Sequence, residues 1–246
     1  MTVFHALPLI YQDYLGQAVA VDEPYELYVN GKLYASLAAN PAALRELAVG
    51  LLVGDGVAAP EDITSIEIRG DERVIEVLAR KAVDTAPGRI EDCSSAAAKG
   101  VHVSSQVTLK MAEILELVGE FDREVLETAK LLAVHSSALF SLDRQEGVVA
   151  HDPSRHVSVL KALGAGFLRG YEMSFSILLT TGRASSDIVV RLARVGVPVL
   201  VSLKGPLMSG LKAAELLGVT LVLRVRTPEG GKRLAPVSHA WRIKGI

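Results

Sequence analysis

The sequence predicts an α/β protein: a three-layer α/β/α sandwich with a partly parallel sheet, preceded by a small N-terminal α+β part. From residue 108 onwards helix and strand patterns alternate. The strand runs FSILLT, VPVLVS and VTLVLRV are apolar and rich in β-branched residues, which is typical of strands covered on both faces. Before residue 108, short strand patterns surround a single helix pattern. We therefore divide the chain into residues 1–107, which include a cysteine-bearing loop at 83–106, and residues 108–246.

The composition limits the classes of partner. With 246 residues, of which 50% are hydrophobic, the chain can bury one sizeable core or a larger and a smaller one. Its 26 basic and 28 acidic residues leave a net charge of -2, so nothing attracts the whole molecule to nucleic acid or to an anionic membrane, and any anion site must be local. No apolar run approaches the roughly 18 residues that span a bilayer, and the N-terminus has no basic leader. We expect a cytoplasmic protein.

The N-terminal part begins with a predicted β-hairpin, YELYVNGKLYASL, whose Asn30-Gly31 pair accepts the positive φ angles of a type I′ turn. A helix follows, with Asn40 as its cap and Pro41 at its first position, and it ends near Gly54. Two strand-like runs, ITSIEIRG and RVIEVLAR, complete this part.

The cysteine-bearing loop carries no convincing period, and so long a segment is usually a functional loop or a disordered one. It holds the one cysteine of the chain, Cys93, which can form neither an internal disulfide nor a CxxC zinc site. A lone cysteine is by default a small apolar filler, but this one has polar neighbours: Glu91, Asp92, Ser94, Ser95 and Lys99. The thiol therefore either packs in the interior without reacting or takes part in a reaction, although the acidic neighbours disfavour a thiolate.

The second part reads as alternating elements. LKMAEILELVG and FDREVLETAKLLAV predict helices, ALFSL and GVVAHD a strand pair, and SRHVSVLKALGAGFLRG a further helix. The remaining pattern predicts strand, helix, strand, helix and strand in turn, without internal repeats. In open α/β sheets, ligands bind beyond the carboxyl ends of the parallel strands, so the loops that follow these strands are the place to look for a site.

Two such loops have the composition of an anion site. TTGRASSD offers Gly182 for close approach, Arg183 for charge and Ser185 as the cap of the next helix, and SLKGPLMSG offers Lys204 in the same relation to its helix. Free backbone N–H groups beside a cation suit a phosphate or a carboxylate. The same residues also serve in ordinary turns, so each loop alone is a weak indication.

The segment HDPSRHVSVLK adds Arg155, His156 and Lys161 to the first two turns of a predicted helix. Cations at a helix N-terminus oppose the helix dipole, which favours an external anion. The alternative is that Arg155 and Lys161 are solvated and His156 packs in the interior. His135 lies between apolar runs, where a histidine is more often a core residue than a ligand or base.

Five segments, taken in order, resemble the FdhD/NarQ family of formate dehydrogenase accessory sulfurtransferases. DEPYELYVNGKLYASLAANPAALRELAVGLLVGDGV resembles the opening of that family, AVHSSALF its GVHxAAL segment, HDPSRHVSVLK its EDVGRHNAVDK segment, TTGRAS its SGRAS loop, and VTLVLRVR its last core strand.

The resemblance implies a cytidine-deaminase-like fold and a homodimer that holds a guanine nucleotide portion near its interface. It implies a sulfurtransferase that takes sulfur from a cysteine desulfurase, carries it as a persulfide on Cys93, and passes it to the molybdenum or tungsten bis-guanine-dinucleotide cofactor of formate dehydrogenase. That cofactor, molybdenum bis(molybdopterin guanine dinucleotide), is a bound substrate, and no catalytic metal of the protein's own is implied. The implied cofactor-binding residues are His135, Arg155, His156, Lys161, Gly182, Arg183, Ser185, Lys204, Arg226, Thr227, Pro228, Glu229 and Gly230.

The sequence also departs from the family pattern. The CGxCG loop of the family corresponds to Cys93–Ala97, so the second cysteine is replaced by Ala96 and both glycines are absent. A single thiol can hold a persulfide but cannot release it by forming a CxxC disulfide. A divergent paralogue that binds the guanine dinucleotide cofactor or a guanine nucleotide without transferring sulfur is the alternative. A nucleotide deaminase is a poor third, because the sequence lacks the cysteines and the HxE motif that hold and assist a catalytic zinc.

Overall fold

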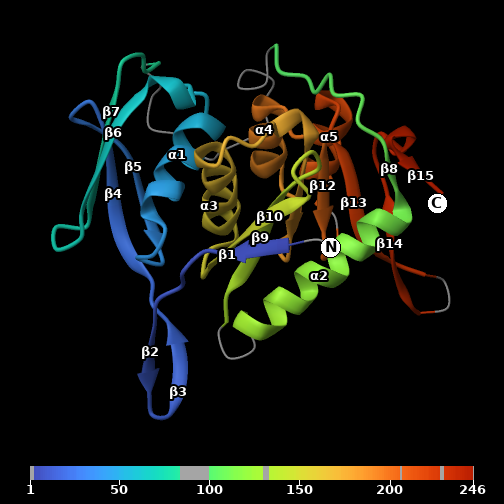
Figure 1. Cartoon of the computed structure of the whole chain (residues 1–246), viewed down its shortest axis with the longest axis horizontal. Coiled ribbons are helices and arrows are strands. Elements are labelled where there is room, and N and C mark those ends of the chain that lie inside the picture. The colour runs from blue at the N-terminus through green and yellow to red at the C-terminus, as the bar shows by residue number, and fades with distance from the viewer. Residues whose placement is uncertain (1–2, 84–99, 130–132, 206, 228–229, 246) are drawn as a thin grey trace.

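The computed structural model of the protein describes residues 3–83, 100–129, 133–205, 207–227 and 230–245. Its centre is a seven-stranded mixed sheet in the order β1-β10-β9-β11-β12-β13-β14 (Figure 1). The strands are β1 (Val3–Ala6), β9 (His135–Ser141), β10 (Glu146–Asp152), β11 (Ser176–Thr180), β12 (Val199–Ser202), β13 (Thr220–Arg226) and β14 (Lys232–Pro236). The strands predicted in the second part of the chain are confirmed.

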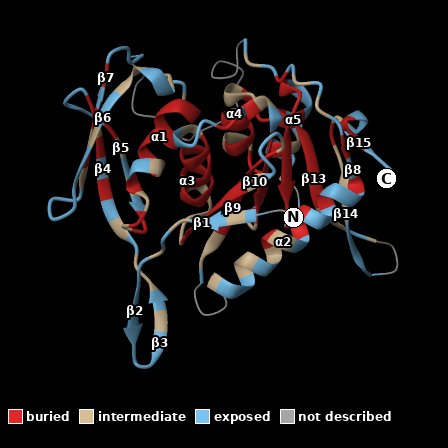
Figure 2. Cartoon of the chain, viewed as in Figure 1, coloured by how far each residue is buried: buried red, intermediate tan, exposed pale blue. Residues whose placement is uncertain are grey.

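Helices cover both faces of this sheet. One face packs against α2 (Met111–Ala129), and the other against α3 (Arg155–Leu168), α4 (Ser186–Val195) and α5 (Met208–Leu217). Successive strand residues point to opposite cores: Ile177 and Leu179 pack on the α2 side, whereas Leu178 packs on the α3–α5 side. The strands are therefore buried on both faces, as their continuous apolar runs predicted, and Figure 2 shows this burial.

A second, four-stranded sheet in the order β5-β4-β7-β6 lies beside the first. Its strands are β4 (Glu23–Val29), β5 (Lys32–Ala39), β6 (Ile63–Arg69) and β7 (Val74–Ala79), and α1 (Leu44–Gly54) packs against them. Asn30 and Gly31 have φ angles of 50° and 76°, so the predicted hairpin and its turn type are confirmed.

The start of α1 differs from the prediction. The helix begins at Leu44 rather than Pro41, and Asn40 is not its cap. The buried Asn40 amide instead donates to the carbonyl oxygens of Ile10 and Val21, at 2.7 Å each, and its oxygen accepts from the Ile10 N–H at 3.0 Å. These bonds close the base of an exposed hairpin, β2 (Tyr11–Tyr14) and β3 (Gln17–Ala20), that projects from the body (Figures 1 and 2).

Two glycines let α1 and α3 touch backbone to backbone. A Cβ on Gly50 would lie 1.9 Å from the carbonyl oxygen of Leu160, and a Cβ on Gly164 would lie 1.8 Å from that of Glu46. Only glycine fits at either position, and this contact joins the second sheet to the first.

Parts of residues 1–107 fold with the larger sheet, which differs from a division of the chain at 107. β1 pairs in parallel with β10, and Val103 packs in the core on the α3–α5 side.

The two helices predicted from residue 109 are one helix, α2, with the exposed Gly119 in its interior. Small elements complete the fold: the strand pair β8 (Leu109–Lys110) and β15 (Ile243–Lys244), and short 3-10 turns at Pro60–Asp62, Met173–Phe175 and Ala240–Arg242. Within the described ranges no helix combines the length and apolarity needed to cross a membrane.

Candidate functional site

The carboxyl ends of four strands form one edge of the large sheet. β11, β12 and β13 are parallel, and β9 runs antiparallel to both β10 and β11, so β10 points the same way as the other three. The loops beyond these ends lead into α3, α4, α5 and the β13–β14 hairpin. His135, at the first position of β9, belongs to the same edge because it pairs with Asp152, the last residue of β10. We call this edge the carboxyl edge.

Buried hydroxyl groups hold the first loop of this edge in place. The Gly182 N–H donates to Thr180 Oγ1 at 3.0 Å, and the Gly182 carbonyl accepts from Ser202 Oγ at 2.7 Å. Thr180 Oγ1 also lies 3.0 Å from Ser137 Oγ, which lies 2.9 Å from Ser158 Oγ on α3. Side chains of two strands therefore hold the N–H and the carbonyl of Gly182, and Ser137 connects this arrangement to the start of α3.

Arg155, the first residue of α3, lies against this loop. A Cβ on Gly182 would lie 3.2 Å from the Arg155 Cβ, so the glycine leaves room for the arginine. The Nε of Arg155 is buried and has no hydrogen-bond partner within the described residues. Because nearly all buried donors in native proteins are paired, this N–H calls for an acceptor. Arg155 is therefore placed to bind an anionic group at the carboxyl edge.

His156 is oriented by a carboxylate on the neighbouring helix. Its Nε2 lies 3.1 Å from Asp187 Oδ2, and the same carboxylate oxygen lies 3.3 Å from Arg191 Nη1. Burial raises the pKa of Asp187, but its hydrogen bond to His156 and the charges of His156 and Arg191 outweigh burial and bring the pKa to about 2. Asp187 is therefore ionised and directs Nδ1 of His156 away from α4. The sequence prediction assigned no role to Asp187, although it is the last residue of the segment TTGRASSD and lies in the first turn of α4.

His135 lies among the cations of this edge. Burial lowers its pKa, and the charges of Arg155, Lys204 and His156 lower it further, while Asp152 raises it. These interactions come from α3 and from the loop after β12, so residues far apart in the chain meet here. His135 is only partly buried and is neutral at pH 7, so its ring can donate or accept a hydrogen bond beside the cations.

Lys161 takes a different place from the one predicted. Lys161 is only 1% exposed. Its amine donates to Asp152 Oδ2 at 2.8 Å and to the Asn40 carbonyl at 2.9 Å. Burial lowers its pKa, and the Asp152 charge opposes this. Asp152 also accepts from the backbone N–H groups of Ser154 and Asn40, at 2.8 and 3.0 Å. Lys161 thus supports the start of α3 from within instead of facing the carboxyl edge.

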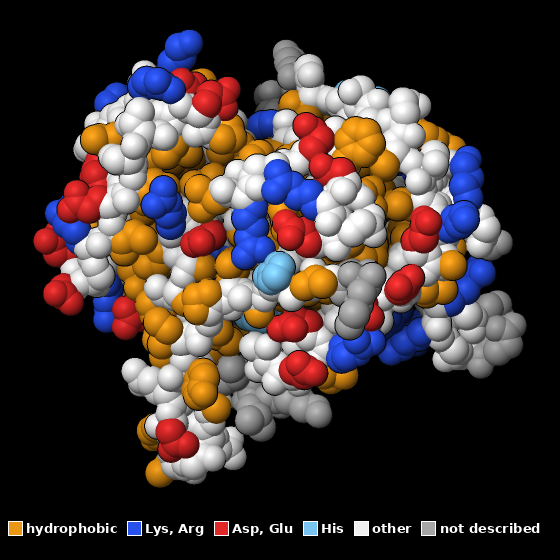
Figure 3. All heavy atoms as spheres, viewed as in Figure 1, with side chains coloured by type: hydrophobic (Ala, Val, Ile, Leu, Met, Phe, Trp, Pro, Cys, Tyr) orange, Lys and Arg blue, Asp and Glu red, His pale blue; other side chains and the backbone are white. Residues whose placement is uncertain are grey.

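The remaining predicted residues spread outwards along the edge. Arg183 and Lys204 are exposed, and Ser185 is buried just before α4. Ser202 pairs with Leu223, so the exposed Arg226 lies three residues further along its strand, followed by Thr227 and Gly230 in the hairpin. Pro228, Glu229 and the proposed carrier Cys93 lie outside the described residues. Charges of both signs and histidine are intermixed on the face seen in Figure 3.

A third histidine at this edge, His151, was missed by the sequence prediction. His151 points to the α2 side, where its Nδ1 lies 2.8 Å from Ser136 Oγ. Its Nε2 is buried and has no partner in the part of the chain that the structure describes. Burial lowers its pKa to about 4, so the ring is neutral.

No group of three or more His, Cys, Asp and Glu side chains suited to a metal ion occurs within the described ranges.

Fold and site together define a mixed α/β protein that gathers cationic side chains at the carboxyl ends of its strands. The sequence matches the model of the FdhD/NarQ family over residues 20–244, and the chain belongs to that family. It is 30% identical over 234 residues to the sulfur carrier protein FdhD of Methanothermobacter thermautotrophicus, covering 92% of each chain.

Two further relatives agree with this assignment. The sulfur carrier protein FdhD of Mycobacterium tuberculosis is 27% identical, with 85% of this chain and 87% of that protein covered. A crystal structure assigned as a formate dehydrogenase accessory protein from Desulfotalea psychrophila superimposes with a TM-score of 0.76 at 27% identity, covering 96% of this chain and 98% of the other. The likeness therefore extends over both sheets.

Proposed function

We propose that this protein carries sulfur as a persulfide on Cys93 and passes it to the molybdenum or tungsten bis-guanine-dinucleotide cofactor of formate dehydrogenase. The observation that carries the proposal is the full-length similarity to proteins named sulfur carrier protein FdhD. The solved neighbour, assigned as a formate dehydrogenase accessory protein, supports the same client. The cytidine-deaminase-like fold, the homodimer and a cytoplasmic location belong to this proposal as well.

The loading step is a thiol exchange. The Cys93 thiolate attacks the terminal sulfur of a persulfide on a cysteine desulfurase, the S–S bond of the donor breaks, and the donor cysteine leaves as a thiolate. Cys93 then holds the transferred sulfur, and no electrons are gained or lost overall. One thiol is sufficient for this step.

The release step needs two electrons, because persulfide sulfur must leave as sulfide to become a metal ligand. A second thiol provides them: it attacks the Cys93 sulfur, forms a disulfide with it and expels hydrosulfide. With Ala96 in place of a second loop cysteine, that thiol must come from outside the loop. We assign it to a small cellular thiol or to a thiol of the client protein.

The carboxyl edge would hold the nucleotide portion of the cofactor. Arg155 supports this assignment most directly, because its buried Nε lacks an acceptor within the described residues. The exposed Arg183 and Lys204 would contact phosphate oxygens, and His135 would hydrogen-bond a neutral group beside them. The segment Arg226 to Gly230 would contact the guanine.

The experiment that tests the proposal follows sulfur directly. The purified protein is incubated with a cysteine desulfurase and labelled cysteine, and Cys93 is examined by mass spectrometry for the gain of one sulfur. We expect that gain in the wild type and none in Cys93→Ser. An unmodified wild type, under conditions in which the desulfurase itself is loaded, would refute the carrier role.

A specific observation also favours the second candidate, a cofactor-binding paralogue without sulfur transfer. Ala96 removes the cysteine with which the family loop would release sulfur, while the cations of the carboxyl edge remain. Titration with GDP distinguishes the two candidates when it is combined with the labelling experiment. Binding of GDP by a protein that never gains sulfur on Cys93 would establish the paralogue.

A further inference from the structure

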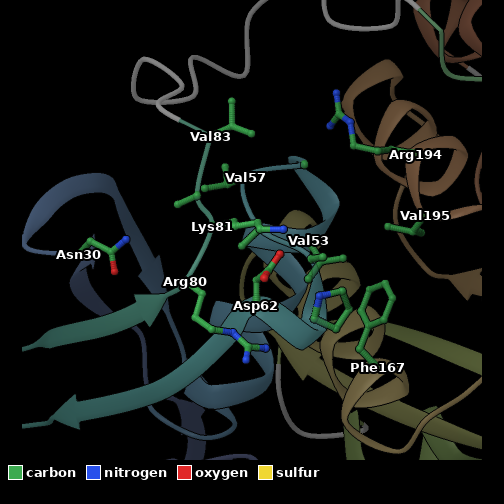
Figure 4. Close-up of a pocket in the computed structure, with 15 residues that line it drawn as sticks. Asn30, Val53, Val57, Asp62, Arg80, Lys81, Val83, Phe167, Arg194 and Val195 are labelled. Carbon is green, nitrogen blue, oxygen red and sulfur yellow. The ribbon is translucent and has the colours of Figure 1, made fainter.

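A crevice opens beside the C-terminal ends of α3 and α4, the ends that lie away from the carboxyl edge (Figure 4). It has a volume of about 730 Å³ and lies between the second sheet and the last residues of α3 and α4. Its lining includes Phe167 and Val195, which stand at the C-terminal ends of those helices, together with Val53 of α1 and Val83. Because α3 and α4 begin at the carboxyl edge, their far ends place this crevice a helix length away from the candidate cofactor site.

The lining combines an apolar floor with basic groups at its margin. Arg80, Lys81 and Arg194 line it together with one carboxylate, Asp62. The Arg80 guanidinium donates to the Glu61 carbonyl, and Arg194 Nη1 donates to the Gly54 carbonyl at 2.7 Å, so both arginines are held in position. Lys81 is exposed, and Figure 4 shows its side chain directed towards Asp62 and the apolar side chains. The crevice therefore favours a partly apolar group that bears negative charge.

The crevice also lies where the cysteine-bearing loop begins. Val83 is one of its lining residues, and Cys93 follows ten residues later in the chain. At about 3.3 to 3.6 Å per residue, ten residues reach at most about 35 Å. The thiol is therefore no more than about 35 Å from Val83, and a protein bound at the crevice leaves the carboxyl edge open for the cofactor.

We propose that this crevice is the docking site for an acidic segment of the sulfur donor, a cysteine desulfurase, with an apolar side chain of that segment on the Phe167 and Val195 floor. The inference rests on the proposed carrier function and adds to it the surface that recognises the donor. Charge complementarity selects the partner: aspartate and glutamate side chains meet Arg80, Lys81 and Arg194. A polypeptide suits the site because the crevice runs across five separate stretches of the chain instead of enclosing a compact ligand.

The test uses the full-length protein and a purified cysteine desulfurase in a biosensor binding experiment. Lys81→Glu reverses an exposed charge in the crevice, and Lys244→Glu reverses an exposed charge on β15 as the matched control. We expect Lys81→Glu to weaken binding about tenfold or more and Lys244→Glu to leave it unchanged. Wild-type binding should also weaken as salt rises from low to moderate ionic strength, and this salt dependence should fall in Lys81→Glu.

Two further measurements separate the possible outcomes. GDP titration should give the same affinity for Lys81→Glu and the wild type, which shows that the variant is folded and that the carboxyl edge is intact. If Lys81→Glu binds the desulfurase as the wild type does while Cys93 still gains sulfur, the docking proposal is wrong and the carrier function stands. If the wild type neither binds the desulfurase nor gains sulfur, both are wrong. A change of oligomeric state in Lys81→Glu, measured by sedimentation, would assign the crevice to a second copy and overturn the docking proposal.

Discussion

At the scale of single residues, the site is defined by side chains whose partners are unusual. Arg155 has a buried Nε–H without a partner among the described residues, which costs about 1 to 3 kcal/mol if no acceptor binds it. His156, in contrast, is already bound to Asp187 at 3.1 Å. The two adjacent residues therefore have different roles: Arg155 is ready for an anion, and His156 is oriented by the protein.

Replacement of Arg155 should weaken nucleotide binding more than replacement of an exposed cation in the same edge. Arg155→Gln removes a guanidinium whose buried Nε lacks an acceptor among the described residues, so we expect the Kd for GDP to rise about 10- to 100-fold. Arg183→Gln removes an exposed charge and should raise it less than about fivefold at physiological salt. Isothermal titration calorimetry measures both. Equal effects of the two substitutions would contradict the role given to Arg155.

His151 should make the stability of the protein fall in mild acid. Burial lowers its pKa from 6.5 to about 4, so below pH 6.5 the unfolded chain binds a proton that the folded chain does not. With respect to this group, the free energy of unfolding is highest above pH 6.5. It decreases as pH falls towards 4, by roughly 3 kcal/mol at most. His135 contributes in the same direction, because its pKa is also lowered.

Urea unfolding at pH 7.5, 6.0 and 5.0 tests this prediction through the slope of the unfolding free energy against pH. His151→Leu should flatten that slope, whatever it does to the stability at pH 7.5. His5→Gln, which changes an exposed histidine, should keep the wild-type slope. A slope that survives in His151→Leu would mean that another group is responsible.

At the scale of elements, the contact of α1 with α3 connects the second sheet to the functional edge. Gly50 and Gly164 bring the two helix backbones together, and α3 begins with the residues that form the site. The buried Lys161–Asp152 ion pair strengthens the same junction through the Asn40 carbonyl. The position of Arg155 therefore depends on helix packing well outside the site.

Gly164→Ala should destabilise the protein by about 3 kcal/mol or more, because its methyl group would lie 1.8 Å from the carbonyl oxygen of Glu46 and the helices must separate. Gly119→Ala is the matched control, since a Cβ there meets nothing within 4 Å on the exposed side of α2. We expect the control to stabilise the protein by about 0.5 to 1 kcal/mol through helix propensity. Urea denaturation measures both changes, and comparable effects of the same sign would refute the packing argument.

At the scale of the whole molecule, the two proposed sites lie at opposite ends of α3 and α4. The carboxyl edge gathers the groups proposed for the nucleotide, and the crevice proposed for the donor lies at the other ends of α3 and α4. Sulfur that enters at one edge and is used at the other must be held on a carrier in between, which is the role proposed for Cys93. Because the loop has one cysteine, release depends on a thiol from outside.

Sulfide release should accordingly depend on added thiol in the wild type and become independent of it in Ala96→Cys. Protein loaded with one sulfur on Cys93 should retain that sulfur in buffer and release it as hydrosulfide when glutathione is added. Ala96→Cys should release it without glutathione and gain a disulfide between positions 93 and 96, whereas Ala96→Ser should behave as the wild type. A sulfide assay and mass spectrometry report both products. Rapid release from the wild type without thiol would show that another reductant operates.

Local patterns in the sequence were sufficient to predict most elements and the shared edge at which the predicted loops meet. The Asn30-Gly31 turn and the apolar runs of the sheet depend on residues a few positions apart, so they can be recognised in the sequence. The loops beyond the parallel strands were expected to meet at one edge, and they do. The boundary of α1 and the break predicted within α2 were wrong, because tertiary packing overrides local propensity at such positions.

The order of the strands predicted in the second part of the chain and the family could be read from the sequence, because these depend on periodicity, turn chemistry and motifs that are contiguous in the chain. Only the tertiary structure decided which polar groups pair with one another. Lys161 meets the carbonyl of Asn40, 121 residues away, and Asp152 meets its N–H across 112 residues. Local spacing carries no information about such partners. The sequence therefore contained no sign that Lys161 is buried and stabilises the interior instead of lying at the surface. The same long-range packing leaves Arg155 with an N–H that still requires an acceptor.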